Sequence, residues 1–101
     1  MMLKSSIQGA NMKVILQFET SKGYEHWKSV FDAHEADRNE WGITKVFSGV
    51  QADNPEIVHV CMNVESAEKM KEFMTKPEVV AIREEAGIKM ETQVMKVVLD
   101  S

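Results

Sequence analysis

His34 and Arg38 are the two side chains whose types and spacing most clearly suggest chemistry. They lie in the stretch HEADRNEWG, residues 34–42. The stretch begins like the zinc-binding pattern H-E-x-x-H, but arginine occupies the position of the second histidine. Arginine stays protonated in proteins and does not bind metal ions. Because a spacing of four places both side chains on one helix face, the pair suggests proton transfer or anion binding rather than a zinc site.

The sequence leaves two interpretations of this pair open. In the functional one, His34 is a general base, since histidine changes charge near neutral pH, and Arg38 holds a carboxylate, enolate or phenolate oxygen through two hydrogen bonds. In the structural one, His34 is a satisfied core histidine and the charged end of Arg38 reaches water. An ion pair from Arg38 to Glu35, Asp37 or Glu84 would favour the structural interpretation.

Aromatic side chains accompany the pair. Residues 24–41 show helical periodicity, and three rings share the helix stripe of the pair. Rings on this stripe could form apolar walls for a flat ligand. Two further rings outside it could close the pocket, although rings at such positions are more often plain core. The predicted ligand-binding residues are Trp27, Phe31, Trp41, Phe47 and Phe73.

Other reactive side chains carry weaker signals. His59 and Cys61 alternate on one predicted strand, but nothing supplies the remaining ligands of a metal site, so no metal is predicted. Cys61 is expected to be inert packing, because a reactive thiol needs a partly exposed, electropositive setting. His26 is expected to be solvated. The sequence has no glycine-rich phosphate loop, nucleophile elbow or paired-carboxylate motif, and no cofactor is predicted.

Charge and composition narrow the function classes. The chain has 101 residues, a net charge of -4 and a single cysteine. A negative charge disfavours binding to nucleic acid or to an anionic membrane surface, and no apolar run approaches the roughly 20 residues of a membrane span. The single cysteine cannot form an internal disulfide, and the N-terminal stretch lacks an apolar signal region. We therefore expect a cytoplasmic protein with no nucleic-acid or membrane partner.

The predicted elements follow the order β-α-β-β-α-β. The pattern indicates a tail over residues 1–12 and one domain over residues 13–101. Pro77 is expected to interrupt the second helical segment, because proline disfavours helical geometry in the preceding residue. The order is that of an α+β, ferredoxin-like fold, with two helices on one face of a four-stranded antiparallel sheet. The expected strands are 13–19, 43–50, 57–64 and 92–99, and the expected helical segments are 24–41 and 67–86.

The two faces of the predicted sheet differ in polarity. The helix-covered face is expected to carry Val14, Leu16, Phe18, Val58, Val60, Met62, Val64, Met95, Val97 and Leu99. The opposite face is mixed but too apolar for water, and its residues are Ile15, Gln17, Ile57, His59, Cys61, Val94, Lys96 and Val98. Two helices cannot cover both faces, and large exposed apolar patches usually mark interfaces. We therefore predict a homodimer joined sheet to sheet, the alternative being a monomer.

Several motifs in consistent order resemble those of the dimeric α+β barrel superfamily. This resemblance covers residues 13–99 and includes antibiotic-biosynthesis-monooxygenase-like domains and uncharacterised domains named as cyclases. It implies a two-fold dimer whose sheets form a barrel, and a cavity between sheet and helices in each subunit. The motifs are W-K-x-V-F-D-x-H-x-x-x-R-x-x-x-G (27–42), D-N-P-x-x-V-x-V (53–60), A-E-K-M-K-E-F (67–73), K-P-E-V (76–79) and E-A-G-I (85–88).

The resemblance also implies a class of activity. In the monooxygenase-like members, the cavity oxidises aromatic polycyclic compounds without metal or flavin. The present chain does not match a complete catalytic set from any of these enzymes, and the superfamily hosts many chemistries. The expected function is therefore binding of a small organic molecule, with cofactor-free oxygenation or cyclase/isomerase chemistry on an aromatic or enolisable compound. The alternative is a non-catalytic ligand-sensing or dimerisation module.

Overall fold

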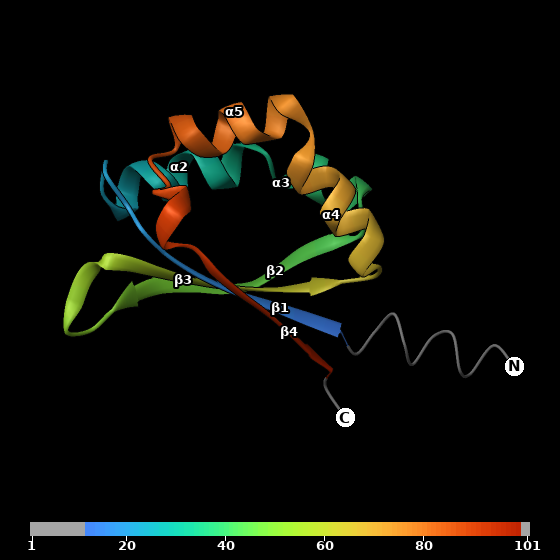
Figure 1. Cartoon of the computed structure of the whole chain (residues 1–101), viewed down its shortest axis with the longest axis horizontal. Coiled ribbons are helices and arrows are strands. Elements are labelled where there is room, and N and C mark those ends of the chain that lie inside the picture. Colours follow the sequence, from blue (N-terminus) through green and yellow to red (C-terminus); the bar gives the residue numbers. More distant parts are fainter. Residues whose placement is uncertain (1–11, 100–101) are drawn as a thin grey trace, which may run out of the picture.

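The computed structural model describes residues 12–99. A four-stranded antiparallel sheet lies below four helical segments, all on one side of it (Figure 1). The strands have the spatial order β2-β3-β1-β4, so the central strands are the first and third in the chain. The elements are β1 (Met12–Glu19), α2 (Tyr24–Ala33), α3 (Glu35–Glu40), β2 (Ile43–Gln51), β3 (Asn54–Val64), α4 (Ala67–Thr75), α5 (Pro77–Glu85), η1 (Met90–Thr92) and β4 (Val94–Leu99).

This architecture confirms the predicted ferredoxin-like α+β fold. The tail expected over residues 1–12 falls almost entirely outside the described residues. Met12, its last residue, already belongs to β1 and pairs with Leu99 of β4.

Both predicted helical segments are divided in two. The interruption before Pro77 follows from the proline: Lys76 has an extended backbone (φ -63°, ψ 135°), and Pro77 begins α5. The interruption at His34 was not predicted, because residues 24–41 keep helical periodicity throughout. His34 has φ -111° and ψ 22°, which separates α2 from α3. The Phe31 carbonyl therefore lies in the last turn of α2, where it accepts a hydrogen bond of 3.2 Å from the His34 backbone N–H and can accept a second one, because a carbonyl oxygen has two lone pairs.

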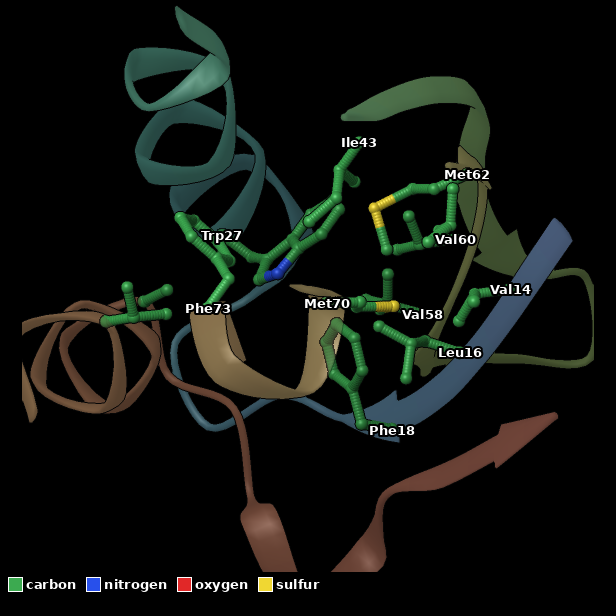
Figure 2. Packing of buried hydrophobic residues seen from close by; sticks show 13 residues of the cluster. Val14, Leu16, Phe18, Trp27, Ile43, Val58, Val60, Met62, Met70 and Phe73 are labelled. Carbon is green, nitrogen blue, oxygen red and sulfur yellow. The ribbon is translucent and has the colours of Figure 1, made fainter. Parts of the chain in front are cut away.

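The core lies between the helices and the two central strands. Figure 2 shows Trp27 of α2 and Phe73 of α4 directed toward the valines and leucine of the sheet. The predicted helix-side sets of the first and third strands, from Val14 to Phe18 and from Val58 to Val64, are buried. This confirms the predicted face for β1 and β3.

β4 has the predicted face but not the predicted burial. Val97 pairs with Val14 and Met95 pairs with Leu16, so these side chains share the helix side of the sheet. Nevertheless every residue of β4 is exposed. β4 is the edge strand, bound only to β1 within the sheet. An apolar sequence pattern indicates which face of the sheet a side chain lies on, whereas burial also requires a helix or another element that covers that face.

Gly42, which ends α3 beside the predicted pair, provides a stability test. Its φ is 75°, and an added Cβ would lie 3.0 Å from Glu65 Cβ. Gly23 has a similar φ of 90°, but an added Cβ there would meet nothing within 4 Å. Gly23 also has a ψ of 158°, a backbone region that is essentially restricted to glycine. We expect Gly23→Ala to lower the free energy of unfolding by about 1–3 kcal/mol from backbone strain alone, and Gly42→Ala to lower it further through the contact with Glu65. Urea denaturation measures both, and equal losses would show that Glu65 yields without penalty.

Candidate functional site

A cavity of about 270 Å³ lies between the helices and the helix side of the sheet. Apolar side chains of β1, β2 and β3 form its floor, and α2 to α5 supply its walls and roof. The structure brings six of the seven predicted site residues to it. These are Trp27, Phe31, His34, Arg38, Trp41 and Phe73.

Phe47 is the predicted site residue that the structure places elsewhere. Regular alternation from Ile43 through Lys45 would put Phe47 on the helix side. A β-bulge between Lys45 and Phe47 shifts the register, so Phe47 pairs with Cys61 on the open face and is 55% exposed. The prediction that Phe47 closes the cavity is therefore wrong, because a bulge reverses the side of every residue after it.

Arg38 is buried, with 7% of its surface exposed. Its Nη1 donates a hydrogen bond of 2.6 Å to the Phe31 carbonyl, and its guanidinium carbon lies 3.5 Å from the centroid of the Phe31 ring. Its Nη2 is buried and has no hydrogen-bond partner among residues 12–99. Thus one edge of the guanidinium is fixed by the helix break, and another buried donor remains unused.

No carboxylate forms an ion pair with Arg38 within the described part of the chain. The ion pairs that would have favoured the structural interpretation are therefore not formed. Burial lowers the pKa of the Arg38 guanidinium, and the charges of Glu35, Asp32 and Asp37 only partly oppose this effect. Arginine nevertheless remains charged at neutral pH. The cavity wall thus contains a cation without a direct counter-ion.

His34 lies at the break between α2 and α3, with 35% of its side chain exposed. Its Nδ1 is 3.5 Å from Asp37 Oδ2. This contact favours the tautomer whose proton is on Nδ1, which leaves Nε2 able to accept a proton. The contact is at the long limit of a hydrogen bond, so Asp37 orients the imidazole only loosely. His26, the neighbouring histidine, does not line the cavity and contacts the Glu85 carbonyl instead.

The aromatic walls form two groups. Trp27 stacks on Phe31, with ring centroids 4.7 Å apart, and Phe31 carries Arg38 on its ring. Trp41 packs against Phe73 with a centroid distance of 5.9 Å. Lys76 places its Nζ 4.7 Å from the Trp41 ring centroid. Flat apolar surfaces thus lie beside cations on two sides of one cavity.

Arg83 is a cavity residue that sequence analysis missed. It lines the same cavity from α5, and its Nη2 donates a hydrogen bond to the Gln93 side-chain oxygen. Burial lowers its pKa to about 10. The signal was present in the sequence, because Arg83 lies four residues after Val79 and three before Ala86, which are apolar and share one helix face with it at this spacing.

Residues 12–99 contain no group of three or more His, Cys, Asp or Glu side chains that could hold a metal ion. No helix in the same range is long and apolar enough to cross a membrane.

Comparison with known proteins identifies a family and a fold. The model of the family described as "Domain of unknown function (DUF3764)" matches residues 12–100. No curated protein is significantly similar to the chain. A candidate antibiotic biosynthesis monooxygenase from Nitrosomonas europaea has a TM-score of 0.65 at 10% identity, with 91% of each chain covered.

Two further structures are similar. A dimeric protein of unknown function with a ferredoxin-like fold, from Bacteroides fragilis, has a TM-score of 0.56 at 15% identity, covering 89% of this chain and 96% of that one. A variant of SnoaB, a cofactor-independent oxygenase from Streptomyces nogalater, has a TM-score of 0.57 at 10% identity, covering 91% and 92%. These likenesses confirm the predicted fold, and at such identities they establish the fold alone.

The Arg38–Phe31 ring contact can be measured with a double-mutant cycle. Phe31→Leu and Arg38→Met should show a coupling energy of about 1–2 kcal/mol, because a cation–π contact is strongest where water is excluded. The hydrogen bond to the Phe31 carbonyl does not enter, since Phe31→Leu keeps that carbonyl. The matched control is Lys45→Met, whose Nζ lies 6.0 Å from the same ring centroid. A coupling to Arg38 no larger than that to Lys45 would contradict the assignment.

Proposed function

The chain belongs to the family described as "Domain of unknown function (DUF3764)", and we propose that it binds a small, flat organic molecule in the cavity and converts it without a bound cofactor. The observation that carries this proposal is the state of Arg38. A buried guanidinium with an unused donor lines an aromatic-walled cavity and has no carboxylate partner within residues 12–99. Such a group is costly to folding unless something else satisfies it. A ligand oxygen would do so.

The proposed roles follow from position. Arg38 holds an oxyanion of the ligand, since the residue lines the cavity and its Nη2 is a buried donor without a hydrogen-bond partner among residues 12–99. His34 acts as the base, since it lines the cavity and its Nδ1 faces Asp37. Trp27, Phe31, Trp41 and Phe73 contact the ring of the ligand. The volume of about 270 Å³ is near the lower end of ligand cavities, roughly 300–1,000 Å³, so a molecule of one or two rings fits.

These roles support proton abstraction from an enolisable or phenolic compound. His34 removes a proton from a CH₂ group next to the conjugated system, and Arg38 stabilises the negative charge that spreads to oxygen. In an oxygenation, the carbanion then adds to O₂ to give a hydroperoxide, which loses water and leaves a carbonyl group. The CH₂ group and one O₂ thus become a carbonyl and one water, and the substrate supplies all four electrons that reduce O₂. Without O₂, return of the proton at another carbon isomerises the compound, whereas attack of the carbanion on a carbonyl carbon of the same molecule, with the proton passing to the resulting alkoxide, closes a ring.

A non-catalytic ligand sensor is the second candidate, and one observation favours it. His34 is one-third exposed and 3.5 Å from Asp37, so its base function lacks a firm orienting contact. In this case Arg38 binds the ligand and no bond changes.

We also propose that the open face of the sheet joins two copies of the chain. Ile15, Phe47, Val94 and Val98 are exposed hydrophobics, and their strand positions place them on this face. The Bacteroides fragilis relative is described as dimeric. A second copy that covers this face would remove the apolar surface from water.

A ligand screen with matched variants tests the binding and catalytic roles. A ligand at 100 times its Kd adds about 2.7 kcal/mol of stability, a rise in Tm on the order of 10 °C for a domain of this size. We expect aromatic or enolisable acids to give this rise, and Arg38→Gln to abolish it. His34→Gln should keep the rise but lose oxygen consumption or proton exchange, whereas His26→Gln should change neither.

Each outcome of this screen selects one candidate. Turnover that survives in His34→Gln would remove the base role. Binding without any turnover by the wild-type protein would establish the sensor. If no compound raises the Tm and Arg38→Gln only lowers stability, both ligand-binding candidates fail.

The dimer is tested on adjacent residues of β4. Val98 pairs with Lys13 and faces the open side, whereas Val97 pairs with Val14 and faces the helix side. A charge buried in an apolar interface costs about 3 kcal/mol or more, roughly a hundredfold in dissociation constant. Sedimentation should therefore show dissociation for Val98→Glu and a stable dimer for Val97→Glu. The reverse pattern would place the interface on the helix side of β4.

A further inference from the structure

We infer that the cavity is built for a small aromatic dianion, whose two acidic oxygen groups are neutralised by Arg38 and Arg83. This inference rests on the proposed ligand-binding function and adds the charge of the ligand to it. The observation behind it is that two guanidinium groups, from α3 and α5, line one cavity without a carboxylate partner for either among residues 12–99.

The contacts of both arginines are neutral. Arg38 donates to the Phe31 carbonyl and lies on the Phe31 ring, and its buried Nη2 has no hydrogen-bond partner among the described residues. Arg83 donates to the amide oxygen of Gln93. A carbonyl and an amide satisfy donors but do not cancel charge. The two cations therefore remain uncompensated until an anion enters.

Acidic side chains also line the cavity, but they do not perform this neutralisation. Asp37, Glu40 and Glu78 are exposed. Asp37 contacts His34, and Glu78 lies 3.8 Å from Lys76. Exposed charges are screened by water and salt, whereas buried charges are not. These three carboxylates are therefore solvated and do not pair with either arginine.

The rest of the lining defines the body of the ligand. Leucine, valine, methionine and aromatic side chains form most of the surface, and the volume of about 270 Å³ limits the ligand to one or two rings. Charge on both arginines together with this apolar lining favours a ring that carries two anionic groups, such as two carboxylates or a carboxylate and an enolate.

A series of probes separates ring binding from charge recognition. Benzamide is neutral, benzoate carries one charge, and phthalate, isophthalate and terephthalate carry two in different geometries. In calorimetric titrations of the wild-type protein, we expect benzoate to bind at least tenfold tighter than benzamide, and at least one dicarboxylate to bind at least tenfold tighter than benzoate. In Arg83→Met the dicarboxylate should lose its advantage over benzoate. Lys28→Met, which removes a surface cation that pairs with Asp32, should keep it.

The stability of the ligand-free protein gives a second measurement. If Arg83 serves a ligand, its replacement by methionine removes a partly buried charge that has no carboxylate partner among residues 12–99, and should raise the Tm without ligand. If Arg83 serves only the fold, the same change should lower the Tm through loss of the Gln93 contact. A lowered Tm together with an unchanged preference for dicarboxylates would overturn the inference.

The remaining outcomes separate the inference from the proposed function. Equal binding of benzamide and the carboxylates by wild type would overturn the dianion and leave the small-molecule cavity standing. A preference for dicarboxylates that survives in both Arg38→Met and Arg83→Met would place the anion outside the cavity and overturn the inference. Failure of all five probes to bind or to raise the Tm would count against both proposals.

Discussion

The interaction on which the site depends is the hydrogen bond from Arg38 to the Phe31 carbonyl. The break at His34 leaves that carbonyl at the end of α2. Nη1 of Arg38, in the next helical segment, donates a hydrogen bond of 2.6 Å to its oxygen. Because the same guanidinium lies on the Phe31 ring, its position is fixed by both backbone and side chain of one residue. Nη2 of the same guanidinium is buried and has no hydrogen-bond partner among residues 12–99, and Arg38 as a whole lines the cavity.

The features that the sequence predicted are those set by local periodicity. Alternation along the first and third strands predicted their buried faces, and the helical stripe over residues 24–41 predicted five cavity residues. The errors arise where geometry is not local. A bulge transferred Phe47 to the open face, and β4 has the correct face without any element to cover it. Arg83 was missed because an arginine on an apolar helix stripe resembles a surface residue until the opposite wall is known.

The two faces of the sheet have different features. The helix side holds the core and the cavity, and there β1 is buried from Val14 to Phe18 and β3 from Val58 to Val64. The open side lacks a covering layer within residues 12–99 and exposes apolar side chains from several strands. The cavity and the apolar surface share the central strands but not their side chains. A dimer formed on the open face would therefore leave the helix-side cavity accessible and support its floor from behind.

The composition of the cavity is difficult to explain by stability alone. Apolar side chains of similar size usually replace a buried charge at no loss, or with a gain, in folding free energy. Two arginines without carboxylate partners within residues 12–99 thus lower the folding stability of the ligand-free protein. Met62, Met70 and Met74 supply an adaptable lining of the same cavity. A positive charge that is already fixed in a water-poor site binds an anion without first having to reorganise. The folding free energy that is lost by holding this charge in the ligand-free protein is the cost of that preorganisation. The charge is therefore more readily understood as part of a binding site than as part of the core.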